Sequence, residues 1–224
     1  MKVMAILLLT LFGLGSGKDP SKTKVTTPTK DESPEQHLIS AKDPSSPENL
    51  WEPYAFKGTE HFKYEITFEV DDEKKEGVYI LDLKKGKGEE MTIHIKGEWE
   101  KNTFESTVTV SEDEFYGALM GQMMMNPAAA PLLVTLFTPW WSMYFVGRDW
   151  KVGSGWSFSE GEKSISFKVE EECEHAGVKG LKGVMRQNGE IMVETCVSPQ
   201  VALPLAAHFR GDEAYSLVLT EYEE

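Results

Sequence analysis

The chain has 224 residues, of which 40% are hydrophobic, and it carries a formal net charge of −14. This length corresponds to one domain or at most two, and the apolar content is enough to form a core. The acidic balance argues against nucleic acid as a partner, because phosphate binding needs clustered Lys and Arg, and it argues against electrostatic docking on anionic lipid surfaces. Any membrane association is expected to be peripheral only.

The first 17 residues have the pattern of a secretory signal peptide. Lys2 supplies the positive start, residues 3–14 form an apolar stretch, and Gly15 and Gly17 suit a cleavage site. The apolar stretch is shorter than the roughly 20 residues that span a bilayer. The pattern predicts an exported protein, periplasmic or extracellular, and an uncleaved N-terminal membrane anchor is the alternative.

Residues 18–54 are predicted to form a disordered linker rich in Pro, Ser, Thr and Lys. Between residues 18 and 50 there are five Pro and no aromatic residue. Such a composition cannot bury enough apolar area to offset the entropy lost on ordering. The folded domain is therefore expected to occupy residues 55–224.

Alternating apolar and polar residues predict β-strands along this domain. In residues 60–70, Phe62, Tyr64, Ile66 and Phe68 alternate with polar residues, which is typical of a half-buried strand. The other predicted strands are residues 77–83, 91–99, 104–110, 164–173, 178–186, 190–197, 202–209 and 214–222. The expected fold is α+β and mainly antiparallel, a curved sheet or unclosed half-barrel of eight to ten strands.

A helical insertion is expected at residues 112–146, after the fourth strand. Residues 115–147 contain no Asp, Glu, Lys or Arg. Pro131 and Pro139 interrupt the stretch, which argues against a membrane span. Two helices, residues 112–125 and 128–138, are the prediction. They either pack as plain core or cover a ligand cavity as a lid, and sequence patterns do not separate these alternatives.

The lid hypothesis names a set of candidate ligand-binding residues. Methionine side chains are flexible and adapt to variable apolar surfaces, so a Met-rich and Trp-rich segment suits a hydrophobic ligand. The residues expected to line or cover the site are Phe115, Leu119, Met120, Met123, Met124, Leu133, Phe137, Trp140 and Trp141. Phe62, Tyr64, Ile66 and Phe68 are expected to form its floor.

The two cysteines, Cys173 and Cys196, allow one intramolecular disulfide in an exported protein. Their predicted strands are separated by a third strand, and strands two apart lie roughly 9–10 Å from each other. A disulfide needs Cα atoms within about 7 Å, so it would require a bulge or bend near residues 172–177. Two reduced, buried thiols are the alternative.

The order of elements resembles that of the bacterial lipoprotein-carrier superfamily, which includes the LolA/LolB-type carriers and the mycobacterial LppX-type proteins. The resemblance covers residues 55–223 as strands, a helical pair and further strands behind an export signal. It implies an unclosed antiparallel half-barrel whose concave apolar face is lidded by helices and holds acyl chains. Arg148 is the arginine nearest to the expected lid, whose closure depends on a single arginine in the carriers.

No arrangement of residues predicts catalysis. The five His are scattered without metal-ligand spacing, and no nucleophile motif occurs. We therefore expect no catalytic residue, no metal and no cofactor. The hypothesis is an exported binding protein for a lipid, an acylated partner or another hydrophobic ligand, held between sheet and lid. The alternative is a protein-interaction module that docks a partner protein through the uncharged segment.

Overall fold

The computed structural model describes most of the chain from residue 50 onward. The described residues are 50–53, 55–70, 73–111, 114–125, 142–148, 150–161, 163–211 and 213–224. The predicted signal peptide, residues 18–49 of the predicted linker and the predicted helix 128–138 lie outside these residues.

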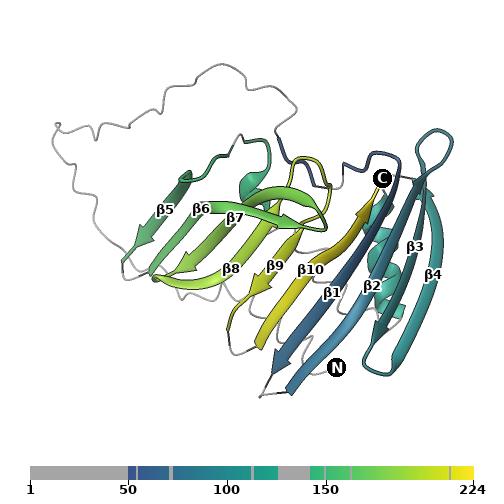
Figure 1. Cartoon of the computed structure of the whole chain (residues 1–224), viewed down its shortest axis with the longest axis horizontal. Coiled ribbons are helices and arrows are strands. Elements are labelled where there is room, and N and C mark those ends of the chain that lie inside the picture. The colour runs from purple at the N-terminus through teal and green to yellow at the C-terminus, as the bar shows by residue number, and fades with distance from the viewer. Residues whose placement is uncertain are drawn as a thin grey trace, which may run out of the picture. The chain divides into compact units, whose positions relative to one another are not determined.

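Ten β-strands form one sheet (Figure 1). They are β1 (Thr59–Val70), β2 (Glu73–Lys85), β3 (Glu90–Trp99), β4 (Asn102–Ser111), β5 (Gly155–Glu160), β6 (Lys163–His175), β7 (Val178–Gln187), β8 (Glu190–Val197), β9 (Ala206–Phe209) and β10 (Glu213–Glu223). Every neighbouring pair is antiparallel. The predicted antiparallel sheet is thus confirmed, with β5 as a strand that the sequence analysis did not include.

The strand order is β4-β3-β2-β1-β10-β9-β8-β7-β6-β5. The first and last strands therefore pair in the middle of the sheet, while β4 and β5 lie at opposite edges and leave it unclosed (Figure 1). The connection from β4 to β5 joins these two edges, at the position predicted for the insertion.

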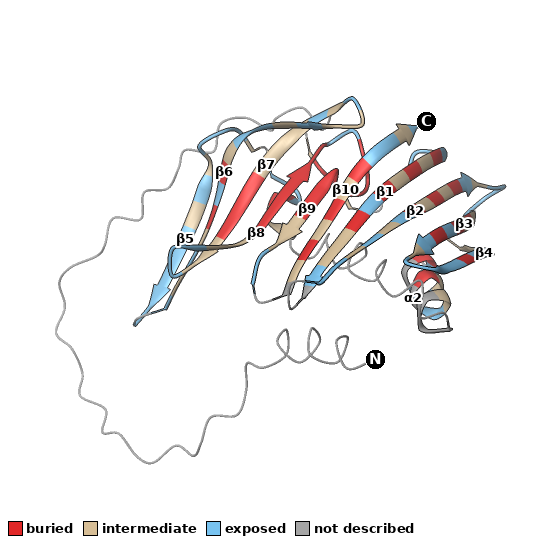
Figure 2. Ribbon diagram, turned by 60° about the horizontal axis from the view of Figure 1, so that its bottom comes forward, coloured by how far each residue is buried: buried red, intermediate tan, exposed pale blue. Residues whose placement is uncertain are grey.

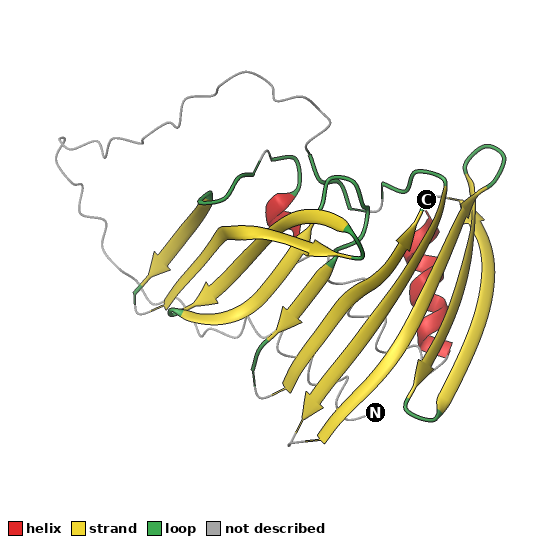
Figure 3. Cartoon of the chain, viewed as in Figure 1, coloured by secondary structure: helices red, strands yellow, loops and turns green. Residues whose placement is uncertain are grey.

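The structure does not show the predicted helical lid. Within the described residues the connection contains one short α-helix, α2 (Phe115–Met125), and the 3₁₀ turn η4 (Met143–Phe145) (Figure 3). The helix ends where predicted and begins three residues later than predicted, next to a hydrogen bond of 2.8 Å from Ser111 Oγ to Glu114 Oε2. No helix in the described part of the chain is long and apolar enough to cross a membrane.

One face of the sheet, here called the apolar face, carries both hydrophobic cores. Strand register puts Tyr64 of β1 opposite Tyr79 and Leu219, and the same side continues strand by strand to Val193 and Phe167. These side chains are buried (Figure 2). The other face of β1–β4 carries the polar residues of each alternating pattern, as expected for a sheet with one solvated side.

The first core lies over β1–β4 and β10. Phe115 and Leu119 of α2 are buried in it, together with Phe62, Tyr64 and Ile66. The Tyr64 hydroxyl donates a hydrogen bond of 2.9 Å to the carbonyl of Pro204, in the buried segment that joins β8 to β9. Residues 202–205 were predicted as part of a strand, but they pack on the first core as a loop segment, and β9 begins only at Ala206.

The second core lies over β5–β8 and includes a residue that the prediction assigned to the linker. Trp51 is 3% exposed and its Nε1 donates to the carbonyl of Val201 at 3.0 Å. It also forms a parallel bridge with Val146. Trp51 thus joins the second core from within residues 18–54, which were predicted as linker.

Candidate functional site

The candidate site is an open groove on the apolar face, above the β6–β8 end of the sheet. Its volume is about 470 Å³, within the range of small-molecule sites. The lining residues are Trp51, Phe145, Arg148, Trp150, Glu172, Lys179, Gly180, Leu181, Val197 and Pro199. A second, smaller cavity of about 310 Å³ adjoins it, since both include Pro199.

The floor of the groove is apolar because the second core continues into it. Trp51, Phe145 and Val197 are buried, and Leu181 of β7 is packed against them. Leu181 pairs directly with Val197, so the two side chains lie together on the apolar face. Trp51 lies just before β1 in the sequence and Phe145 belongs to η4, and both pack on these strands.

Phe145 and Trp150 line one side of the groove, here called the aromatic wall, and pack around Phe167 of β6. The centroid of Phe167 lies 5.2 Å from that of Phe145 and 5.6 Å from that of Trp150, both edge-on. Gly183 of β7 lies beneath them: an added Cβ would come within 2.5 Å of the Phe167 ring and 2.6 Å of the Phe145 ring. The absence of a side chain at Gly183 thus permits the aromatic packing, worth about 0.5–1.5 kcal/mol per ring pair beyond area burial.

A disulfide lies behind the strands that line the groove, on the face opposite to Leu181 and Val197. Cys173 of β6 and Cys196 of β8 are bonded, with Cα atoms 6.3 Å apart across β7. Strands two apart approach this closely because the intervening residue opposite Cys173 is Gly180, where an added Cβ would lie 2.4 Å from the Val197 carbonyl oxygen. The bulge in β6 lies between Val169 and Glu171, just before the region where the sequence analysis required one.

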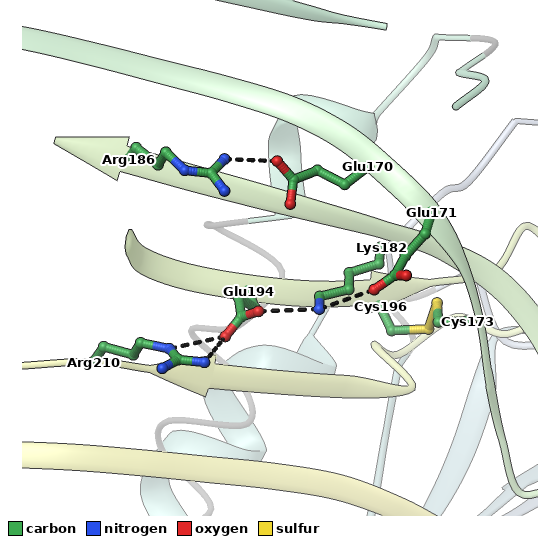
Figure 4. Close-up of polar contacts among 8 residues, drawn as sticks. All are labelled: Glu170, Glu171, Cys173, Lys182, Arg186, Glu194, Cys196 and Arg210. Atoms are coloured by element: carbon green, nitrogen blue, oxygen red, sulfur yellow. Dashed lines mark hydrogen bonds and ion pairs between the residues drawn. A yellow bond between two sulfur atoms is a disulfide. The ribbon is translucent and has the colours of Figure 1, made fainter. Parts of the chain in front are cut away.

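Ion pairs link the same strands on the opposite face, beside the disulfide (Figure 4). Lys182 Nζ lies 3.1 Å from Glu171 and 3.0 Å from Glu194, and Arg210 also binds Glu194. Burial alone would raise the pKa of Glu194, but hydrogen bonds from Arg210 and Lys182 outweigh it and lower that pKa. These contacts link β6, β7, β8 and Arg210, the residue that follows β9, behind the groove.

A row of His and carboxylate side chains crosses the polar face of β1–β4. His61 Nδ1 and His94 Nδ1 contact the two oxygens of Asp82 at 2.6 Å and 2.9 Å, and His94 Nε2 contacts Glu105 at 2.9 Å. Hydrogen bonds to Asp82 and then Glu105 raise the pKa of His94. The described residues contain no group of three or more ligands that could hold a metal, and we assign this row to cross-strand stabilisation.

The residues predicted to bind a ligand lie in three places. Phe62, Tyr64, Ile66, Phe115 and Leu119 are buried in the first core, against which Phe68 packs as a partly buried residue. Met120, Met123 and Met124 belong to α2, and their side chains are outside the described ones. Leu133, Phe137, Trp140 and Trp141 lie outside the described residues. The two cavities reported above include none of the predicted residues.

The groove was missed from the sequence because its residues come from five separate segments. Two local signals were present. Gly177, Gly180 and Gly183 recur at every third residue, which in a strand indicates a bend or close approach of another chain segment. Trp51 is the first aromatic residue after a polar stretch. Neither signal identifies its contact partner, since the partners lie more than 90 residues away in the chain or on a neighbouring strand.

No family model and no curated protein matches the sequence. The chain is similar to a solved structure from Bacteroides fragilis, named as a candidate exported protein with a YmcC-like fold, with 8% sequence identity and a TM-score of 0.25. The match covers 79% of this chain and 100% of that chain. The unclosed antiparallel sheet agrees with the fold expected from the carrier resemblance, and membership of that superfamily stays a prediction.

Proposed function

We propose that the protein is an exported binding protein that holds a hydrophobic ligand by burial and performs no covalent chemistry. One observation carries the proposal: the groove of about 470 Å³ has an apolar, largely aromatic floor and opens to solvent on the apolar face of the sheet. Burial of apolar surface gives roughly 25 cal/mol per Å². Export itself is proposed from the signal-peptide pattern of residues 1–17.

The ligand would be a lipid, an acylated molecule or another compound with an extended apolar part. The rings of Trp51, Phe145 and Trp150 offer flat apolar surface, and Leu181 and Val197 offer aliphatic surface. Such a lining favours contact with hydrocarbon over specific hydrogen bonding. The uncharged residues between α2 and η4 are proposed to add to the binding surface, as in the lid hypothesis.

A neutral fluorescent dye tests this proposal directly. N-phenyl-1-naphthylamine should bind the wild-type protein with increased emission, and lipid extracted from freshly purified protein should compete with it. Leu181→Glu places a charge in the groove and should weaken dye binding about tenfold or more. Val152→Glu is the matched control, since Val152 is 50% exposed and outside the lining. Equal dye affinity in Leu181→Glu and Val152→Glu would refute the assignment.

A protein-interaction module is the second candidate. Phe158 of β5 and Ile165 of β6 pair directly and are 59% and 37% exposed at the edge of the sheet. An exposed apolar pair on an edge strand favours contact with another protein chain. If Phe158→Ser changes the sedimentation behaviour of the protein while dye binding is unaltered, an additional docking role is supported.

A further inference from the structure

The polar groups of the groove rim are mostly hydrogen-bond donors. Arg148 and Lys179 line the groove, both are exposed, and neither has a carboxylate within ion-pair distance among the described residues. The other two arginines of the chain, Arg186 and Arg210, are each paired with a glutamate. Arg148 instead lies over the Trp150 ring, 5.6 Å from its centroid, which keeps the guanidinium at the rim.

A third donor lies in the aromatic wall. Trp150 Nε1 is buried, and it has no hydrogen-bond partner in the described part of the chain. Buried donors are paired in the great majority of cases, and an unpaired one needs an explanation. The indole is held by its contacts with Phe145 and Phe167, whose centroids are 6.1 Å and 5.6 Å away. An acceptor group on a ligand at this end of the groove would satisfy it.

The charge of the rim indicates a single negative charge on the ligand. Arg148 and Lys179 contribute two positive charges and Glu172 one negative charge, so the described lining carries a formal charge of 2 − 1 = +1. This contrasts with the net charge of −14 for the whole chain. Glu172 would oppose a second negative charge on a ligand held between the two cations.

We propose that the ligand is a monoanionic amphiphile, a single-chain molecule of the fatty-acid class with a carboxylate head at Arg148, Lys179 and Trp150 and its chain on the apolar floor. This proposal rests on the proposed function, because the hydrocarbon part of the ligand must bind in the groove before the protein can recognise the head group. A charge-assisted hydrogen bond to such a head contributes about 1.5–3 kcal/mol, which corresponds to roughly tenfold or more in affinity.

Matched amphiphiles of one chain length test the proposal by displacement of N-phenyl-1-naphthylamine, each kept below its micellar concentration. Laurate should displace the dye at about tenfold lower concentration than lauryl alcohol, and dodecyltrimethylammonium should be weaker than both. Acetate, which has the head group without the chain, should displace nothing. Dodecyl methyl phosphate carries the same single negative charge on a phosphate head group and should displace the dye less well than laurate. If it displaces the dye as well as laurate does, the protein recognises the charge alone and the assignment of a carboxylate head is refuted.

Variants locate the preference. Arg148→Gln with Lys179→Gln should reduce the ratio between the affinities for laurate and lauryl alcohol, both measured by dye displacement from the same variant, to within about twofold. Lys151→Gln is the control, because Lys151 is exposed in the same connection and does not line the groove. Trp150→Phe, which keeps the ring and removes the donor, should reduce the ratio part of the way.

The outcomes separate this inference from the proposed function. If the dye binds but laurate and the alcohol compete equally, or if the double variant keeps the wild-type preference, the anionic ligand class is refuted and apolar binding stands. If neither the dye nor any amphiphile binds the folded wild-type protein, the proposed function itself fails.

Discussion

Removal of the disulfide between Cys173 and Cys196 should both destabilise the protein and loosen the groove. The change is the double substitution Cys173→Ala with Cys196→Ala, which leaves no free thiol. The bond joins β6 to β8 across β7, and its neighbours Glu172 and Val197 line the groove. The native contacts that remain include the strand pairing and the ion pairs beside the bond, so the strands stay paired but lose their covalent link.

The magnitude follows from the length of chain that the bond closes. The two cysteines are 23 residues apart in sequence. Closing a loop of this length in the unfolded chain removes conformational entropy equivalent to about 3 kcal/mol of folding stability. Loss of the sulfur atoms from a buried position adds to this cost, since Cys196 lies in the first core and is 4% exposed.

Urea unfolding followed by tryptophan fluorescence measures the effect. Wild type unfolded in the presence of a reductant should lose about 3 kcal/mol of unfolding free energy, and the double variant should lose somewhat more because it also lacks the buried sulfur atoms. Dye affinity, measured under conditions where the variant is folded, should fall relative to wild type. An unchanged midpoint and slope in the double variant, with unchanged dye affinity, would refute the view that the bond supports the strands that line the groove.

Three further changes probe the sheet. Gly183→Ala should lower the free energy of unfolding by about 1–3 kcal/mol, because the added Cβ would meet two aromatic rings. Gly121→Ala in α2 has nothing within 4 Å of the added Cβ and should raise the free energy of unfolding by up to about 1 kcal/mol. Urea midpoints of the two variants that shift in the same direction would contradict this. His94→Gln should lower the free energy of unfolding most below about pH 6, because there His94 is charged beside ionised carboxylates in the wild type. The difference in unfolding free energy from wild type should disappear as the pH rises through the raised pKa of His94. A difference that does not change with pH would contradict this. Glu194→Gln should cost about 1–3 kcal/mol by leaving two cations without their shared carboxylate, and exposed Glu160→Gln should cost nothing measurable by the same assay.

The strands were predictable because one face of the sheet is buried and the other is solvated. Period-2 alternation predicted β1, β3, β4 and β6, and turn signals placed the later strands. The Asn188-Gly189 turn between β7 and β8 has the positive φ angles of 52° and 86° that its residue types favour. β5 was missed although Trp156 and Phe158 alternate with serines, because a run of six residues gives a weak signal beside a long uncharged segment. Local periodicity determines strands but not their order in the sheet.

The groove could not be predicted, since it depends on contacts between distant segments. Trp51 meets Val201 across 150 residues, and Cys173 reaches Cys196 only because Gly180 lies between them. The candidate residues chosen from sequence were the most apolar ones, and those that are described in full are core. Apolar composition alone does not distinguish a filled core from a ligand surface, because both minimise contact with water.

The position of the uncharged stretch explains where the groove lies. The connection between β4 and β5 joins opposite edges of the sheet, and its described ends both pack on the apolar face: Phe115 in the first core and Phe145 in the second. A charge at either buried end would be costly, which accounts for the composition there. Arg148 is the first charged residue after the stretch, and it is exposed at the rim of the groove. The groove therefore forms where the chain passes from buried apolar contacts to solvent, and such a boundary suits a ligand with one apolar end and one charged end.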